Sequence, residues 1–290
     1  MLYPLKFKPI LKQTIWGGDK LAYKSNDPKV KESIGESWEI SGVQDNISVV
    51  SEGALEGNSL QELTEIYMGD LVGDKIYEKF GIEFPLLIKY IDARDNLSIQ
   101  VHPDNAYALK EEGQYGKTEM WYIMDCKEGA FLYYGFKEEI SREEFERRIK
   151  EDTLLEVLNK VMVKKGDVLF IEAGTIHAIG KDIVIAEIQQ NSNVTYRVYD
   201  YGRVGKDGKK RELHIGKALD VTRRAPAENR SFRPHVASCE YFTVDSLYLD
   251  GRTMKKVEGT VDEASFVSVI FMEGRGVIRC GGEALEFQKG

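Results

Sequence analysis

The segment 97–103 constrains the fold of this 290-residue chain more than any other feature, because apolar and polar residues alternate along it. Positions 97, 99 and 101 are apolar, whereas the intervening residues are Ser98, Gln100 and His102. A period of two is that of a β-strand with one buried face. The polar residues therefore share one face, where the oxygen of Gln100 and a nitrogen of His102 can converge on a cation. The segment predicts a β fold in which this strand lines a site.

Other short segments with the same period predict that the whole chain is mainly β. They cover residues 161–163, 167–171, 183–190, 194–201, 241–249 and 266–271. Many short strands with helices between them are typical of jelly-roll barrels. Capping boxes at Ser59 and Ser141 begin two helices, and a third helix is expected near 215–222. The helix that begins after Ser141 is predicted to be long, because an apolar stripe continues from Phe145 to Leu158.

Composition excludes several classes of protein. Hydrophobic residues make up 42% and charged residues 30%, as in globular proteins that function in water. A net charge of −8 without a basic run argues against a nucleic-acid partner. Three widely spaced cysteines without a CxxC pattern indicate reduced thiols. Without a signal peptide or an apolar run long enough to span a membrane, the sequence predicts a cytoplasmic protein with no membrane partner.

The end of the sequence resembles the segment before an internal strand. Gln288, Lys289 and Gly290 match the segment 164–166, which precedes the predicted strand 167–171. We therefore expect a second jelly-roll barrel that is truncated at Gly290. Residues 223–227 form a plausible linker, so the predicted domains are 1–230, which is catalytic and has helical insertions, and 231–290, which is an incomplete jelly roll.

Residues 166–177 form a second segment that can deliver an imidazole into a barrel. A glycine turn at Gly166 precedes a strand, and a second turn at Gly174 precedes His177. The segment resembles the second sequence motif of the cupins, although Glu172 stands where that motif usually has proline. Together with Glu119, at the start of another predicted strand, the two segments offer two nitrogen and two oxygen donors: Gln100, His102, Glu119 and His177. This donor set suits zinc or another first-row divalent ion.

Each histidine taken alone has a plainer interpretation, namely a hydrogen-bonded structural residue. The spacing of the donors is not a metal signature by itself, because it lacks a short helical pattern such as HExxH. The presence of both histidines in strand-forming segments favours a metal. His214 and His235 fit no motif, and we interpret both as structural.

Several segments in order along the chain resemble the type I mannose-6-phosphate isomerases, in their short bacterial form. They are Trp16-Gly17, Gly35 to Trp38, Ser98-x-Gln100-x-His102-Pro103, Lys117-x-Glu119, Gly174-Thr175-x-His177 and Tyr196-Arg197. The resemblance extends from the first strands to about residue 222. It implies two cupin barrels with helical insertions and one zinc ion held by Gln100, His102, Glu119 and His177. It also implies that Arg197 is catalytic.

The resemblance further implies which residues contact the substrate, a small sugar phosphate. They are Lys89, Ser98, Lys117 and Arg203, with Trp16 and Glu36 in the wall of the site. For Trp16, core packing is the ordinary alternative. Two positions differ from longer relatives, because Asn193 replaces an aspartate and Gly116 replaces a histidine. These differences leave the groups that open the sugar ring unassigned.

The sequence around the charged residues also favours roles for them in binding or converting an anionic substrate. Arg197 and Thr195 share a predicted strand face, and a planar guanidinium suits a phosphate or a developing enediolate. An ordinary ion pair is the alternative. Lys89 interrupts an apolar run that should be buried, which is costly unless the amine is paired or used, and burial lowers the pKa of a lysine. For Lys89 a snorkelling side chain is the alternative, and for Lys117 an exposed strand-end charge. Lys117 and Lys89 are candidates for proton transfer or for holding a phosphate.

The resemblance implies that the reaction is the interconversion of mannose 6-phosphate and fructose 6-phosphate through an enediol, with Zn²⁺ as cofactor. Three alternatives stay open. One is a cupin isomerase of another sugar phosphate, such as glucose 6-phosphate. A second is a cupin dioxygenase, which would favour a histidine-rich iron site over one containing Gln100. The third is a sugar-binding jelly roll without turnover, which would not require a Lewis acid. The sequence does not specify the oligomeric state.

Overall fold

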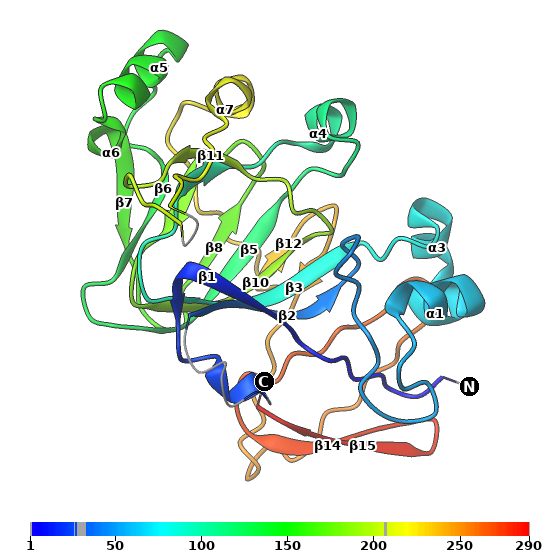
Figure 1. The fold of residues 1–290 in the computed structure, drawn as a ribbon. Coiled ribbons are helices and arrows are strands. Elements are labelled where there is room, and N and C mark those ends of the chain that lie inside the picture. The colour runs from blue at the N-terminus through cyan, green and yellow to red at the C-terminus, as the bar shows by residue number, and fades with distance from the viewer. Residues whose placement is uncertain (1, 26, 28–32, 206–207, 290) are drawn as a thin grey trace. The chain divides into compact units, whose positions relative to one another are not determined.

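The computed structural model describes residues 2–25, 27, 33–205 and 208–289, and its regular structure is mainly β (Figure 1). The helices and strands are β1 (Ile10–Gly18), η1 (Ala22–Lys24), β2 (Ile34–Ser41), α1 (Leu60–Tyr67), α2 (Gly69–Val72), α3 (Asp74–Phe80), β3 (Leu86–Ala93), β4 (Ile99–Val101), α4 (Asn105–Glu111), β5 (Glu119–Cys126), β6 (Phe131–Phe136), α5 (Arg142–Lys150), α6 (Leu154–Val157), β7 (Leu158–Met162), β8 (Val168–Ile171), β9 (His177–Ile179), β10 (Ile183–Gln190), β11 (Tyr196–Tyr199), α7 (Ile215–Val221), β12 (Ala237–Ser238), β13 (Thr243–Val244), β14 (Arg275–Cys280) and β15 (Glu283–Gln288). The chain divides into two compact units, one of residues 11–38 with 87–230 and one of residues 1–10, 39–86 and 231–290.

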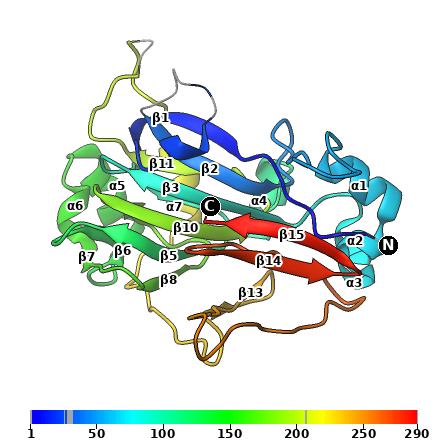
Figure 2. The ribbon, with the colours of Figure 1, turned by 90° about the horizontal axis from the view of Figure 1, so that it is seen from below.

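The unit of residues 11–38 and 87–230 is built on two sheets. One sheet has the strand order β1-β2-β3-β10-β5-β8, and the other has the order β11-β4-β9-β6-β7. Figure 2 shows β2, β3, β10 and β5 side by side in the first sheet. The register pairs within these sheets are antiparallel, for example between β10 and β5 and between β4 and β9. This arrangement confirms the prediction of a mainly β fold.

Two hydrophobic clusters show which face of each strand is buried. The first cluster combines residues of both sheets, including Trp121, Ile185, Leu132 and Ile179, and therefore fills the space between the sheets. The second cluster combines the other face of the five-stranded sheet with residues of α5, α6 and α7, which gather around that sheet in Figure 1. The five-stranded sheet is thus covered on both faces.

The alternation predicted for residues 97–103 separates these two faces. Ile99 and Val101 belong to the second cluster, called the outer cluster below because it lies between the five-stranded sheet and the helices α5 to α7. Both residues are fully buried. Gln100 therefore points to the inner side. It pairs in register with His177 of β9 and with Arg197 of β11, so three polar side chains lie in a row across neighbouring strands.

The prediction of one long helix after Ser141 is wrong. Ser141 caps α5 by accepting the N–H of Glu144, as predicted, but the helix ends at Lys150. Asp152 has a φ of 59°, which lies in the left-handed region and interrupts the helix. Only the four-residue α6 follows, and Leu158 is the first residue of β7. The apolar stripe continues past the end of α5 because residues of α5, α6 and β7 all pack in the outer cluster, so it does not indicate one continuous helix.

The second unit, of residues 1–10, 39–86 and 231–290, contains α1 to α3 and two small sheets. The capping box at Ser59 is present, with Glu62 bonding back to the backbone of Ser59. The predicted strand 241–249 is reduced to Thr243–Val244, and no strand occurs at 266–271. Instead β14 and β15 form a two-stranded sheet (Figure 2).

Among the described residues of this unit, neither two-stranded sheet closes into a barrel. Gly290, on which the predicted truncation depends, lies outside the described residues. The second jelly roll, its truncation and the domain boundary at 230 stay predictions. In the ranges that the structure describes, every helix is too short or too polar to cross a membrane.

Candidate metal centre

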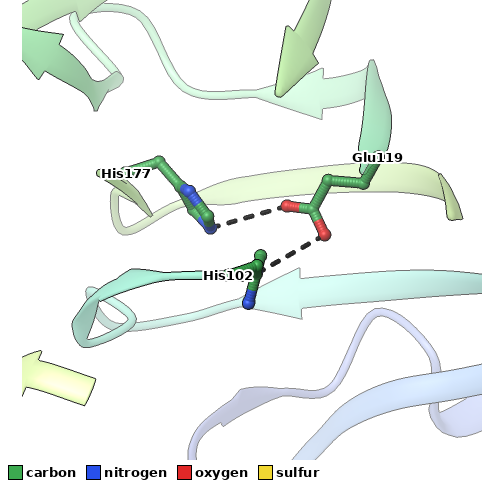
Figure 3. Close-up of side chains that lie close together, drawn as sticks. All are labelled: His102, Glu119 and His177. Carbon is green, nitrogen blue, oxygen red and sulfur yellow. Dashed lines mark ion pairs between the residues drawn. The ribbon is translucent and has the colours of Figure 1, made fainter. Parts of the chain in front are cut away.

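Three of the four predicted metal ligands meet in the unit of residues 11–38 and 87–230. One ligand atom from each of His102, Glu119 and His177 lies within 4.8 Å of the others. Nε2 of His102 is 3.6 Å from Oε2 of Glu119, and Nε2 of His177 is 3.5 Å from Oε1 of the same carboxylate. Figure 3 shows both imidazoles turned toward the carboxylate. All three side chains are buried.

The backbone delivers each ligand at the end of a strand. His102 follows β4 directly, Glu119 is the first residue of β5, and His177 is the first residue of β9. The glycine turn before His177 is necessary, because Gly174 has a φ of 84° and a Cβ there would meet the carbonyl oxygen of Val221 at 2.9 Å. The polar cluster therefore lies between the sheets, with the first hydrophobic cluster beside it.

Backbone carbonyls determine the tautomer of both histidines. Nδ1 of His102 is 2.9 Å from the carbonyl oxygen of Val194, and Nδ1 of His177 is 2.8 Å from that of Thr175. Because a carbonyl oxygen only accepts, both Nδ1 atoms must carry the proton when the rings are neutral. The lone pair of each ring is then on Nε2, the atom that faces Glu119. Metal-binding histidines commonly have this arrangement.

The polar atoms of this cluster lack the hydrogen bonds that buried groups normally make. Nε2 of His102 and Oε1 of Glu119 are buried and have no hydrogen-bond partner among the described residues. Leaving such groups unpaired costs about 1–3 kcal/mol each, or more when they are charged. A divalent cation coordinated by these atoms would remove this cost, so the residues present fit a metal.

The protonation states of the metal-free cluster follow from burial. Burial lowers the pKa of His177 to about 4. Burial and the positive charge of Lys117 lower the pKa of His102 well below its usual range. Burial and the neighbouring carboxylate of Glu187 raise the pKa of Glu119 to about 7. The histidines are therefore neutral at pH 7, as metal binding requires.

Gln100, the fourth predicted ligand, lies beside the cluster. Its side-chain nitrogen is 3.4 Å from Nε2 of His177, and its Cα is in register with that of His177. In the tautomer that the carbonyl of Thr175 imposes, Nε2 of His177 accepts this amide N–H in a long hydrogen bond. Turning the amide by 180° would place the carbonyl oxygen, which can bind a metal, at the same point.

A second group of buried charges adjoins the cluster, and the sequence reasoning identified only part of it. Glu187 of β10 is buried, and its Oε1 lies 3.0 Å from Nζ of Lys89 and 3.7 Å from Nζ of Lys117. Its other oxygen accepts the indole N–H of Trp121 at 2.9 Å. Glu187 interrupts the apolar run 183–188 of β10, as Lys89 interrupts that of β3, so the same signal that drew attention to Lys89 could have identified it.

The lysines are held by carboxylates and are not free amines. Lys89 also contacts Oε2 of Glu36 at 3.3 Å, and Lys117 contacts Oε2 of Glu119 at 3.0 Å. The expectation of a lowered pKa for Lys89 is wrong. Burial favours a lower value, but the carboxylates of Glu187 and Glu36 outweigh it and raise the pKa of Lys89 above its ordinary value. Lys89 is therefore an ammonium at neutral pH. The positive charges of Lys89 and Lys117 outweigh the effect of burial on Glu187 and lower its pKa.

Arg197 is half-buried on β11, in register with Gln100. Its Nη1 donates to the carbonyl oxygen of Glu212 at 2.9 Å, whereas its Nε is buried without a partner among the described residues. Burial, together with the charge of Arg211, lowers the pKa of Arg197. Nδ1 of His214 accepts the backbone N–H of Arg197 at 3.1 Å, so His214 has a structural contact with the predicted catalytic residue.

The remaining predicted residues are less closely grouped. Arg203 is bound to Asp200 and donates to the carbonyl oxygen of Asn96. Ser98 is buried one residue before β4. Trp16 packs in the first hydrophobic cluster, as its ordinary interpretation predicts. Glu36 accepts the indole N–H of Trp38 at 2.6 Å.

Comparisons with known proteins identify one class of protein that this chain is similar to, the sugar-phosphate isomerases. The family model for the catalytic domain of type I phosphomannose isomerase matches residues 4–129. Mannose-6-phosphate isomerase ManA of Bacillus subtilis is 38% identical over 302 residues, covering 99% of this chain and 91% of that protein. Mannose-6-phosphate isomerase of Streptococcus mutans is 38% identical over 299 residues, covering 100% of this chain and 91% of that protein.

A solved structure gives the same result. The crystal structure of mannose 6-phosphate isomerase from Bacillus subtilis superposes with a TM-score of 0.81 at 33% identity, covering 100% of this chain and 92% of that one. The chain therefore belongs to the type I phosphomannose isomerase family. This confirms the resemblance found in the sequence.

Proposed function

We propose that this chain is a metal-dependent isomerase that interconverts mannose 6-phosphate and fructose 6-phosphate through an enediol. The observation that carries the proposal is the buried cluster of His102, Glu119 and His177 in a member of this family. Its ligand atoms converge, and those of His102 and Glu119 include buried atoms without a hydrogen-bond partner among the described residues. The reaction removes a proton alpha to a carbonyl and returns it to the neighbouring carbon. Such a step needs stabilisation of the negative charge that develops on the substrate oxygens.

We assign His102, Glu119, His177 and Gln100 as ligands of one Zn²⁺ ion. Two imidazole nitrogens and a carboxylate oxygen are ordinary zinc ligands, and a neutral amide oxygen is the weakest of the four. When bound, the ion would act as a Lewis acid toward substrate oxygens. The protein holds both imidazoles in the tautomer that leaves Nε2 unprotonated, and it keeps the cluster buried.

We assign Arg197 and Lys117 as catalytic residues. Arg197 lies beside Gln100 across two strands and has a buried N–H without a partner among the described residues, which is a donor available to an oxyanion. Lys117 places an ammonium 3.0 Å from Oε2 of Glu119, where it can give a proton or a hydrogen bond to a substrate oxygen.

The substrate contacts are proposed for Lys89, Ser98 and Arg203, with Trp16 and Glu36 in the wall. Lys89 is an ammonium bound to Glu187, so we assign it electrostatic support and not proton abstraction. Arg203 already shares Asp200 with Arg211, and two guanidinium groups on one carboxylate leave positive charge for a phosphate. This local charge offsets the net charge of −8.

We also propose the architecture of the family for this chain. Two antiparallel sheets that enclose the cluster are consistent with a cupin barrel in the part of the chain up to residue 230. Residues 231–290 are proposed to belong to a second jelly roll that supplies packing or wall, because they contain His235 as their single histidine, and that residue pairs with Asp245.

A coupled assay of fructose 6-phosphate formation tests the proposal. The purified protein should convert mannose 6-phosphate, lose activity after chelation and dialysis, and recover it when Zn²⁺ is added. Glucose 6-phosphate and unphosphorylated mannose should be converted at least tenfold more slowly. Equal turnover of glucose 6-phosphate would replace the assigned substrate. Absence of any turnover in the zinc-loaded protein would support a binding protein instead.

A further inference from the structure

Gln189 is a fully buried residue of β10 for which neither the motifs nor the proposed mechanism gives a role. It lies directly opposite Glu119 in the pairing of β10 with β5, so the two side chains share one face of the sheet. Its amide nitrogen donates to the carbonyl oxygen of Gln190 at 2.8 Å and to that of Ser192 at 2.6 Å. Both donors are used, so the amide cannot be turned without loss.

These two hydrogen bonds hold the turn 190–194, which connects β10 to the residues before β11. Within the turn, the N–H of Ser192 donates to the carbonyl oxygen of Gln190, and the N–H of Val194 donates to Oγ of Ser192. Ser192 and Val194 are buried. Gln189 thus holds the first part of the turn through Gln190 and Ser192, and Ser192 holds Val194, so the position of the Val194 carbonyl depends on both.

The carbonyl of Val194 is the group that accepts Nδ1–H of His102, at 2.9 Å. This hydrogen bond keeps the lone pair of His102 on Nε2, facing Glu119. His177 has a different partner, the carbonyl of Thr175, which is not part of the turn. A change at Gln189 should therefore affect one histidine of the cluster and leave the other in place.

We propose that Gln189 is a positioning residue that holds the turn 190–194 and thereby sets the tautomer and orientation of His102 for metal binding. The inference rests on the proposed metal site. The carbonyl of Val194 touches a ligand and not the metal, and partners of that kind typically contribute 10- to 100-fold to metal affinity; Gln189 acts through this carbonyl. Burial strengthens the effect, because water cannot replace the lost hydrogen bonds.

The first measurement is the affinity for Zn²⁺, by competition with a chromophoric chelator, of the wild-type chain and of Gln189→Met. Methionine has a similar length and removes both donors. We expect about a 10- to 100-fold weaker affinity. Phe145→Leu is the control, because Phe145 is equally buried but packs in the outer cluster beneath α5. It should lower thermal stability and leave the affinity unchanged.

The second measurement needs no metal. Long-range ¹⁵N–¹H NMR spectra of the imidazoles in the metal-free chain report the tautomer of each ring. In the wild type, His102 and His177 should both be protonated at Nδ1. In Gln189→Met, His102 should become a mixture of tautomers while His177 stays unchanged.

The results separate this inference from the metal site itself. A wild-type chain that fails to bind Zn²⁺ contradicts the metal site, and the NMR comparison still decides whether Gln189 controls His102. The inference is overturned if Gln189→Met binds zinc as the wild type does. It is also overturned if the tautomer of His102 is unchanged, or if both histidines change together as they would in a loosened core.

Discussion

At the scale of single residues, the site is defined by charges that would be unfavourable without one another. The carboxylate of Glu119 contacts His177 through Oε1, and His102 and the side-chain nitrogen of Lys117 through Oε2. Removing one member of a buried charged pair usually costs about 3–5 kcal/mol, because its partner is left uncompensated. The cluster therefore combines a site for a cation with a charge balance that the fold itself needs.

Substituting Arg197 by lysine tests whether its planar guanidinium acts on the transition state. Lysine keeps the charge but loses the fork of donors. We expect kcat for mannose 6-phosphate to fall by about 10²- to 10³-fold, the usual effect of losing an oxyanion donor, while KM stays nearly constant. Steady-state kinetics measure both. An increase in KM with unchanged kcat would instead make Arg197 a phosphate anchor.

Metal binding should release one proton below pH 7. The pKa of Glu119 in the metal-free chain is raised to about 7, so at pH 6 the carboxyl must lose its proton before it binds a cation. The pKa of His177 is about 4 and that of His102 is also lowered, so both histidines are already neutral and release none. Apparent affinity should thus rise about tenfold per pH unit below pH 7 and level off above it.

Isothermal titration calorimetry in buffers of different ionisation enthalpy counts the released protons. A matched titration at pH 8 is the control and should show a release near zero. Release of two or more protons at pH 6 would mean that the histidines titrate with Glu119, against the assigned protonation states.

At the scale of secondary structure, the strands sort residues by face. The polar row of Arg197, Gln100 and His177 crosses β11, β4 and β9 on the inner side, while Ile99 and Val101 face the helices. A sequence period of two was sufficient to predict this separation. The break at Asp152 was not predictable in the same way, because residues of α6 and β7 both pack on the outer cluster and give a continuous apolar stripe.

Two neighbouring substitutions on β4 should therefore change different properties, one the stability and the other the zinc affinity. Val101→Ala removes a buried side chain from the outer cluster and should lower the free energy of unfolding by about 2 kcal/mol, with zinc affinity unchanged. Gln100→Ala should weaken zinc binding and change the stability of the metal-free chain little. Urea unfolding and chelator competition measure the two quantities. A loss of metal affinity in Val101→Ala equal to that in Gln100→Ala would show that the faces are not independent.

At the scale of the whole molecule, features that local sequence patterns determine were predicted, whereas features that depend on strand pairing or on burial were not. The donors His102, Glu119 and His177 were found from strand period and the resemblance, and the structure brings them together. Glu187 was missed although a charge within an apolar run could have marked it, as it did for Lys89. The position of Gln189 opposite Glu119 depends on the pairing of β10 with β5, which joins segments some 70 residues apart in the chain. The predicted strands 241–249 and 266–271 failed because residues such as Val267 and Val269 are exposed, so their pattern does not report burial.

The most direct test of the central claim compares His177→Ala with His235→Ala. His177 is a buried member of the cluster, whereas His235 is exposed and pairs with Asp245 in the other unit. Zinc content by elemental analysis and fructose 6-phosphate formation are measured on the same preparations. We predict that His177→Ala loses both metal and activity while His235→Ala retains both. A His177→Ala protein that carries one zinc per chain and isomerises mannose 6-phosphate at the wild-type rate would contradict the account.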